Sequence, residues 1–223
     1  YDVTVLDPRG FGELGHLLAG IDWVIYHAKE YNIRVMNLSL ATDSTDSHLT
    51  DPLCRAVRSA TAVGITVVAA AGNFGRNAAG TEVYGSVGSQ GHCPTIITVG
   101  SVNSKGALGR GDDTVNFFSS RGPTRGAYLD AKGVRQVDNL LKPDLVAPGN
   151  KIIGALAADK FGLFTDYLAN TYPQLSAGLP TTKGLRLMML SGTSISAPVV
   201  AGTVALMLQA NPGLTPPLIK AIL

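Results

Sequence analysis

Residues 192–202 read Gly-Thr-Ser-Ile-Ser-Ala-Pro-Val-Val-Ala-Gly, and a run rich in Ala, Val and Leu continues from them to Ala210. Because this run is apolar nearly all round, it predicts a helix over residues 197–210 that is buried in the middle of the domain. Ser194 stands at the mouth of that helix, where free backbone N–H groups favour negative charge. A lone serine there is more often a helix cap, so the rest of the chain has to decide its role.

Composition narrows the class of protein. The chain has 223 residues, 26 of them glycine, and only 15% are charged, against about 25% in an average soluble domain. Such a composition excludes disorder and suits a close-packed α/β enzyme with tight loops. Scattered charges with a net charge of +2 argue against a nucleic-acid partner. The longest apolar stretches seen in the sequence fall short of the ~20 residues of a membrane span.

The first hundred residues alternate between strand and helix patterns. Strands are predicted at residues 3–6, 33–40, 65–71 and 95–99, with helices at 15–31 and 51–63 between them. This order predicts right-handed βαβ units and a three-layer α/β/α fold with a mainly parallel sheet. Ligands of such sheets bind beyond the carboxyl ends of the strands, here near Asp7, residues 39–41 and residues 72–73.

The second half of the chain gives weaker signals. Strands are predicted at residues 115–118 and 152–156, a polar loop at 119–139, a rigid connection at 143–149 and a final helix after Pro217. Residues 157–187 are expected to be an insertion, with helical turns near 161–168. Two cysteines are too few for a disulfide framework, so Cys54 and Cys93 are expected to be unpaired thiols.

Residues 10–15 spell Gly-Phe-Gly-Glu-Leu-Gly between a predicted strand and a predicted helix. This is the dinucleotide-binding pattern, in which backbone amides hold a pyrophosphate. However, residues 7–9 separate the strand from the first glycine, and no acid for the ribose precedes Asp43 at the end of the next strand. A flexible glycine-bearing loop is therefore the preferred interpretation, and a nucleotide-dependent oxidoreductase is kept as a remote alternative.

Five segments, in order along the chain, resemble the subtilisin-like serine proteases (subtilases). Residues 192–202 are similar to the nucleophile motif of that family, and residues 67–73 are similar to the strand and turn that end in its oxyanion-hole asparagine. Residues 6–12, 36–41 and 141–149 agree as well. The resemblance implies a serine endopeptidase in which Ser194 is the nucleophile and forms an acyl-enzyme. Asn73 and the Ser194 N–H would then be the donors to the oxyanion.

The resemblance also implies where a polypeptide substrate lies. It would run extended between a glycine loop and the segment after the second strand, beside the nucleophile. The residues expected to bind it are Gly10, Gly12, Leu38, Ser39, Leu40, Ala41, Gly72 and Thr193. Asp144 is expected to be a structural hydrogen-bonding group, although some relatives hold a cation in this region. No metal or cofactor is expected in this chain, with structural Ca²⁺ left open for the parent protein.

A subtilase also needs a histidine base and an aspartate that orients it. None of the four histidines is followed by Gly-Thr, and no aspartate has the expected context. We therefore expect residues 1–223 to be the C-terminal two-thirds of one catalytic domain, truncated at its N-terminus and inactive alone. Its partner would be the missing N-terminal part or a second copy, in an extracellular or cell-envelope setting. The alternative is a non-catalytic binding or structural module with the same fold.

Overall fold

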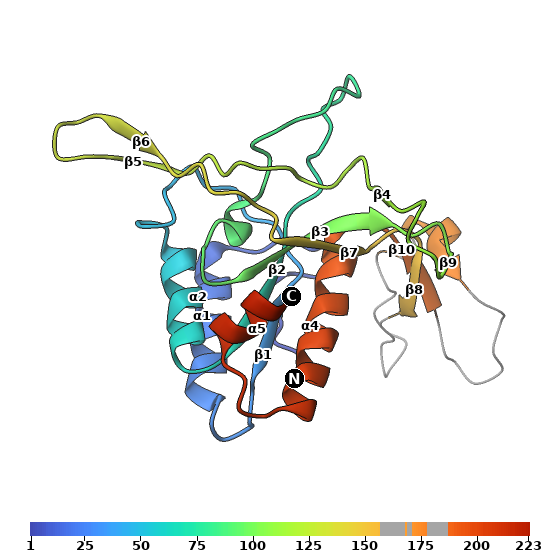
Figure 1. Cartoon of the computed structure of the whole chain (residues 1–223), viewed down its shortest axis with the longest axis horizontal. Coiled ribbons are helices and arrows are strands. Elements are labelled where there is room, and N and C mark those ends of the chain that lie inside the picture. Colours follow the sequence, from blue (N-terminus) through green and yellow to red (C-terminus); the bar gives the residue numbers. More distant parts are fainter. Residues whose placement is uncertain (157–167, 169–170, 178–186) are drawn as a thin grey trace.

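The computed structural model describes residues 1–156, 168, 171–177 and 187–223 (Figure 1). Its main sheet contains β1 (Val35–Leu38), β2 (Thr66–Ala70) and β3 (Ile97–Asn103) in that order. β7 (Leu145–Pro148) pairs with β3 in parallel, as β1 does with β2 and β2 with β3, whereas the short β4 (Thr114–Val115) is antiparallel. The predicted, mainly parallel sheet is confirmed.

Helices cover both faces of this sheet. α1 (Leu14–His27) and α2 (Pro52–Ala62) share one core with β1 and β2, and α4 (Thr193–Ala210) and α5 (Pro216–Ile222) share the other with β2, β3 and β7 (Figure 1). Side chains of β2 alternate between them: Val67 and Ala69 enter the first core, Val68 and Ala70 the second. Because both faces are covered, every residue of β2 is buried. The three-layer α/β/α architecture is therefore confirmed.

The start of α2 illustrates how sequence sets an element. The carboxylate of Asp51 accepts hydrogen bonds from the N–H groups of Leu53 (2.7 Å) and Cys54 (3.1 Å), and Pro52 occupies the first turn. The fixed helix start brings Cys54 to Cys93, with their Cα atoms 5.3 Å apart, and the two form a disulfide. The expectation of unpaired thiols is wrong, because the chain folds back over the 39 positions that separate the two cysteines and places both in one core.

Three local predictions fail. Residues 3–6 do not form a strand, since no neighbouring strand pairs with them among the described residues. The loop expected at 119–139 contains the antiparallel hairpin β5 (Ala127–Leu129) and β6 (Arg135–Val137), whose turn is closed by Asp130. The rigid connection at 143–149 contains the parallel strand β7, because its two prolines lie at positions that the strand tolerates.

A second, antiparallel sheet contains β8 (Ile152–Ala155), β10 (Leu187–Leu190) and β9 (Ser176–Ala177), in that order. The strand predicted at residues 152–156 is confirmed. Short 3₁₀ turns are η1 (Ser89–Gly91) and η2 (Pro173–Leu175). Most of the insertion predicted at 157–187, including its helical turns near 161–168, lies outside the described residues and stays a prediction.

α4 starts at Thr193, earlier than predicted, and one of its faces is uncovered. Val199 is 40% exposed and Leu206 66% exposed, so the expectation of a helix buried all round is wrong in part. With 18 residues and a mean hydropathy of 1.4, this helix is long and apolar enough to cross a membrane, and 33% of it is buried. Its buried side packs on β1, β2 and β3. The absence of a membrane partner stays a prediction.

Asp144 connects the end of the chain to the sheet. Its Oδ2 accepts from the Lys142 Nζ and the Thr98 N–H, both at 2.7 Å, and its Oδ1 lies 3.0 Å from the Nζ of Lys220 on α5. Burial lowers the pKa of Lys142 to about 8. Burial alone would raise the pKa of Asp144, but the Lys142 ammonium and the other donors hold it below its usual value. The structural role expected for Asp144 is confirmed.

Candidate active site

The carboxyl ends of β1 and β2 meet the N-terminus of α4, as expected for a parallel sheet. Ser39, which follows β1, donates its hydroxyl to the main-chain carbonyl of Ser194 at 2.7 Å. Asn73, in the loop after β2, accepts at Oδ1 from the Thr193 N–H at 2.9 Å and from the Thr193 Oγ1 at 3.1 Å. Two segments distant in sequence, those after β1 and after β2, therefore hold the first turn of α4.

Two N–H donors flank one point beside Gly192. A Cβ atom built on Gly192 would lie 3.4 Å from the Asn73 Nδ2 and 3.7 Å from the Ser194 backbone nitrogen. Both hydrogen bonds from Thr193 go to the side-chain oxygen of Asn73, so the Asn73 Nδ2 is left to donate to another acceptor. The Ser194 N–H donates to none of the described residues, as is usual in the first turn of a helix. Paired donors at a helix N-terminus stabilise a developing negative charge.

Gly72 is required by the turn that presents Asn73. Its φ is +107°, and a Cβ there would lie 2.9 Å from the Ser120 Oγ and 3.2 Å from the Phe74 ring. Its N–H donates to the Oγ1 of the fully buried Thr193 at 3.1 Å. Thr193 therefore contacts both residues of the turn, and the predicted residues Gly72, Asn73, Thr193 and Ser194 form one hydrogen-bonded unit.

Ser194 is half-buried, and its hydroxyl has no hydrogen-bond partner among the described residues. All four histidines lie elsewhere. His27 contacts the Trp23 carbonyl, His48 pairs with Asp138, and His92 donates to the Val87 carbonyl. His16 lies on α1, beside a cavity that does not include Ser194. No histidine therefore contacts the Ser194 hydroxyl in the described part of the chain.

A cavity of about 330 Å³ opens next to this unit. It is lined by residues 41–43, Phe74 and residues 85–88. Of the predicted substrate-binding residues, Ala41 therefore lines this cavity, whereas Ser39 contacts Ser194. Leu38 is buried, and Leu40 lines a different cavity, beside β1. Sequence gives one weak sign that residues 85–88 line a cavity, namely the many small residues that follow Asn73.

The loop that contains Gly10 and Gly12 is held closed by the side chain of Asp7. The Asp7 carboxylate accepts from the N–H groups of Arg9 and Phe11, both at 2.9 Å, and a Cβ on Gly12 would lie 2.5 Å from the Val5 carbonyl oxygen. Gly10 has a φ of +85° and faces open space. Gly12 lines a cavity that does not include Ser39, so a substrate position between these segments stays a prediction. The described residues contain no group of three or more His, Cys, Asp or Glu that could hold a metal ion.

Fold and site define the class: a three-layer α/β protein with a serine and an asparagine amide at the carboxyl edge of a parallel sheet. The chain belongs to the subtilase family, whose family model matches residues 1–223. It is 34% identical over 226 residues to "Serine protease AprX" of Bacillus subtilis (strain 168), covering 99% of this chain and 44% of that protein. It is 29% identical to "Subtilisin amylosacchariticus" of Bacillus subtilis subsp. amylosacchariticus, covering 95% of this chain and 39% of that protein.

Solved structures agree on the fold. A cold-adapted subtilisin-like serine proteinase superposes with a TM-score of 0.60 at 26% identity, covering 97% of this chain and 56% of that one. Sphericase superposes with a TM-score of 0.66 at 22% identity, covering 98% and 57%. The resemblance of the separate motifs to subtilases is therefore confirmed as family membership. The chain spans less than half the length of these two curated relatives.

Proposed function

We propose that this chain is part of a subtilisin-type serine endopeptidase and supplies its nucleophile and oxyanion donors. The observation that supports this proposal is the convergence of the Asn73 Nδ2 and the Ser194 N–H on one point beside Gly192. In the first step the Ser194 Oγ bonds to the scissile carbonyl carbon while a base takes its proton. The C–N bond then breaks, the amine leaves with that proton, and water releases the acyl group. This chemistry uses no cofactor.

The base comes, in this proposal, from polypeptide outside this sequence. Support comes from the four histidines, each of which has contacts or a position away from Ser194. The chain alone would then be nearly inactive, with at most the ~10³–10⁴-fold acceleration over water that remains when triad members are removed. By family resemblance, we place the whole protein in an extracellular or cell-envelope setting.

The proposed substrate is a polypeptide in extended form. Its side chain before the scissile bond would enter the cavity of about 330 Å³ beside Ala41 and Phe74. Phe74 and Val87 give the cavity apolar walls, which suit a large apolar side chain. Residues 38–41 and the loop with Gly10 and Gly12 would flank the rest of the substrate.

Labelling with a fluorophosphonate tests the proposal on the longest natural polypeptide that contains this chain. We expect covalent labelling at Ser194, found by mass spectrometry, and none in Ser194→Ala. Ser59→Ala is the matched control, since Ser59 is an exposed serine on α2 and its loss leaves the label unchanged.

One observation favours a second candidate, a non-catalytic module that binds extended peptides. It is the unpaired hydroxyl of Ser194 among the described residues. Absence of labelling in a polypeptide whose further residues include Asp-Thr-Gly and His-Gly-Thr segments would refute the enzyme. The same result, together with peptide binding, would support the module.

A further inference from the structure

Gln90 is a buried glutamine that connects the parts of the chain around the cavity of about 330 Å³. It lies in η1 and is only 1% exposed. Its Nε2 donates to the carbonyl of Ala70, the last residue of β2, at 2.9 Å. Its Oε1 accepts from the Thr42 N–H at 2.9 Å and from the Thr42 Oγ1 at 3.3 Å. Because the Ala70 carbonyl can only accept and the Thr42 N–H can only donate, these partners fix the orientation of the Gln90 amide.

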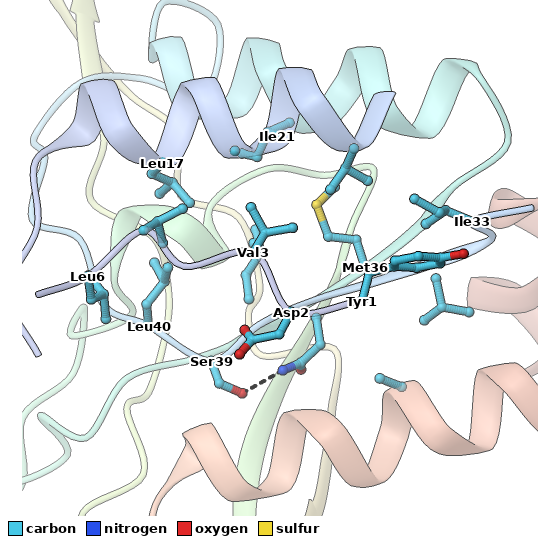
Figure 2. Close-up of a pocket in the computed structure, with 17 residues that line it drawn as sticks. Tyr1, Asp2, Val3, Leu6, Leu17, Ile21, Ile33, Met36, Ser39 and Leu40 are labelled. Carbon is cyan, nitrogen blue, oxygen red and sulfur yellow. Dashed lines mark hydrogen bonds between the residues drawn. The ribbon is translucent and has the colours of Figure 1, made fainter. Parts of the chain in front are cut away.

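Thr42 belongs to the first wall of this cavity, residues 41–43. Besides its bonds to the glutamine, its carbonyl accepts from the Ser89 N–H at 3.1 Å, and its hydroxyl forms a hydrogen bond with the Ser89 hydroxyl. The segment that precedes this wall is held at Ser39, which donates to the Ser194 carbonyl at 2.7 Å and also lines the separate cavity beside β1 (Figure 2). The first wall is therefore fixed by α4 on one side and by η1 at Thr42.

The second wall, residues 85–88, leads directly into η1. The Gly88 N–H donates to the Ala71 carbonyl at 2.9 Å. A Cβ on Gly88 would lie 2.5 Å from the Gln90 Oε1 and 2.6 Å from its Nε2. The φ of Gly88 is −68°, which any residue adopts, so the close approach of the amide is what requires glycine here. One planar amide thus contacts both walls and the end of β2, the strand that leads to Asn73.

We propose that Gln90 is a positioning residue that fixes the spacing of the two walls and so selects the side chain preceding the scissile bond. The inference rests on the proposed function, since it requires a substrate side chain in this cavity. Phe74 and Val87 offer apolar surface to a large apolar side chain, and that contact depends on the spacing of the walls. Gln90 is not itself part of the lining, so it acts on the substrate only through Thr42 and Gly88.

Removing the amide should loosen the walls, because its partners include main-chain groups that need a hydrogen bond inside the protein. In Gln90→Met the side chain keeps its length and approximate shape, but the Ala70 carbonyl and the Thr42 N–H lose their partner. Residues 41–43 would then move until water or another group pairs with Thr42. Such a shift affects a large side chain that touches both walls, and it leaves a small side chain almost unaffected.

The test compares two substrates of the longest natural polypeptide that contains this chain, succinyl-Ala-Ala-Pro-Phe p-nitroanilide and the same peptide ending in Ala. In Gln90→Met, the ratio of kcat/KM for the Phe substrate to kcat/KM for the Ala substrate should fall about tenfold, while the Ala value stays that of the parent. Gln136→Met is the matched control, an exposed glutamine on β6, and should leave both values unchanged. In the 223-residue chain, hydrogen exchange at the Thr42 amide should be faster in Gln90→Met alone.

A carboxyl at this position separates positioning from folding. In Gln90→Glu the ionised carboxylate can accept from Thr42 but cannot donate to the Ala70 carbonyl, whereas the protonated carboxyl can do both. Because burial raises the pKa of a carboxyl, the substrate ratio should equal that of Gln90→Met at about pH 8 and return toward that of the parent at about pH 5. The parent measured at each pH corrects for other titratable groups, of which Asp43 and His92 lie nearest in the sequence.

The outcomes separate this inference from the proposed function. If the parent cleaves both substrates, an unchanged ratio in Gln90→Met, a ratio in Gln90→Glu that does not vary with pH, or unchanged exchange at Thr42 would overturn the role of Gln90 alone. A parent that cleaves neither substrate and takes no fluorophosphonate label would refute the proposed function, and this inference with it. If circular dichroism shows that Gln90→Met does not fold, the two pH values of Gln90→Glu decide the question.

Discussion

At the scale of single residues, Asn73 has two separate tasks. Its carbonyl oxygen fixes the first turn of α4 through Thr193, and its amide nitrogen is left beside the Ser194 N–H. Since the two tasks use different atoms, substitutions can separate them. Sequence motifs predicted Asn73 and Ser194 as site residues. The hydrogen bonds from Thr193 and Ser39 could not be predicted, because they depend on side-chain geometry that no motif contains.

Substituting Asn73 tests the two tasks. In an active preparation that includes the source of the base, Asn73→Ala should lower kcat about 10²–10³-fold, the loss seen when such a donor is removed from subtilisin, with little change in KM. Asn73→Asp keeps the acceptor for Thr193 but loses the donor, so it should lose as much activity and less stability. Steady-state kinetics and urea unfolding measure both. Unchanged kcat in Asn73→Asp would contradict the donor role.

Gly72 allows a second residue-scale prediction. Gly72→Ala should destabilise the chain by more than the ~1–2 kcal/mol cost of a left-handed residue, because its Cβ would also crowd Ser120. Gly80→Ala is the matched control, with a φ of +77° and no atom within 4 Å of the new Cβ. Urea unfolding compares the two variants. Equal losses of stability would show that crowding at Ser120 has no effect.

At the scale of elements, the sequence predicts the layered part of the fold well. Helices α1 and α2 and strands β1 and β2 carry complete periodic patterns, and Asp51 marks the start of α2. The hairpin β5–β6 was not predicted, because its exposed strands show no apolar alternation. The strand predicted at residues 3–6 was wrong for the opposite reason. Their apolar pattern is that of a strand, but strand formation needs pairing partners that local sequence cannot supply.

The base of this hairpin is held by one carboxylate. Asp138 accepts from the His48 N–H at 2.8 Å and from the Ser47 hydroxyl, and its Oδ2 lies 3.1 Å from the Nδ1 of the His48 ring. Burial alone would raise the pKa of Asp138, but these hydrogen bonds outweigh burial and lower it. A lowered pKa in the folded state means that this contribution to stability is present above the unfolded pKa of about 3.9 and is lost as pH falls further.

Acidification should therefore loosen the hairpin before the core. We expect limited proteolysis with pepsin below pH ~4 to cut first between residues 127 and 137. In Asp138→Asn the hairpin should already be loosened at neutral pH, where trypsin should cut after Lys132 or Arg135. Asp22→Asn, an exposed carboxylate on α1 and outside the hairpin, is the control. First cleavage in the core at low pH would contradict this prediction.

At the scale of the whole molecule, the two cores differ in how completely they are covered. The core of α4 and α5 is closed at one end by Lys142, Asp144 and Lys220, whereas the exposed face of α4 and the edge of β1 remain open. We therefore expect the isolated chain to be marginally stable or to self-associate. A cooperative, monomeric unfolding transition by size exclusion and calorimetry would contradict that expectation.

The disulfide should account for a large part of the remaining stability. Cys54 and Cys93 are 39 positions apart in the sequence, and removing a disulfide that closes such a loop costs about 2–4 kcal/mol. Cys54→Ala together with Cys93→Ala should lower the free energy of unfolding by that amount in urea titrations, and a reducing agent should do the same to the parent alone. If the reductant lowered the midpoint of the double variant equally, the effect would not come from this bond.

The interlock of Asn73 with Thr193 joins residues 120 positions apart, and Ser39 reaches Ser194 across 155. The donor pair therefore exists only after α4 has docked on strands made from the first third of the chain. A nascent or partly folded polypeptide has the serine but no assembled anion site. Under the proposed protease function, a partly folded copy therefore cannot cleave its neighbours, because it does not yet possess that site.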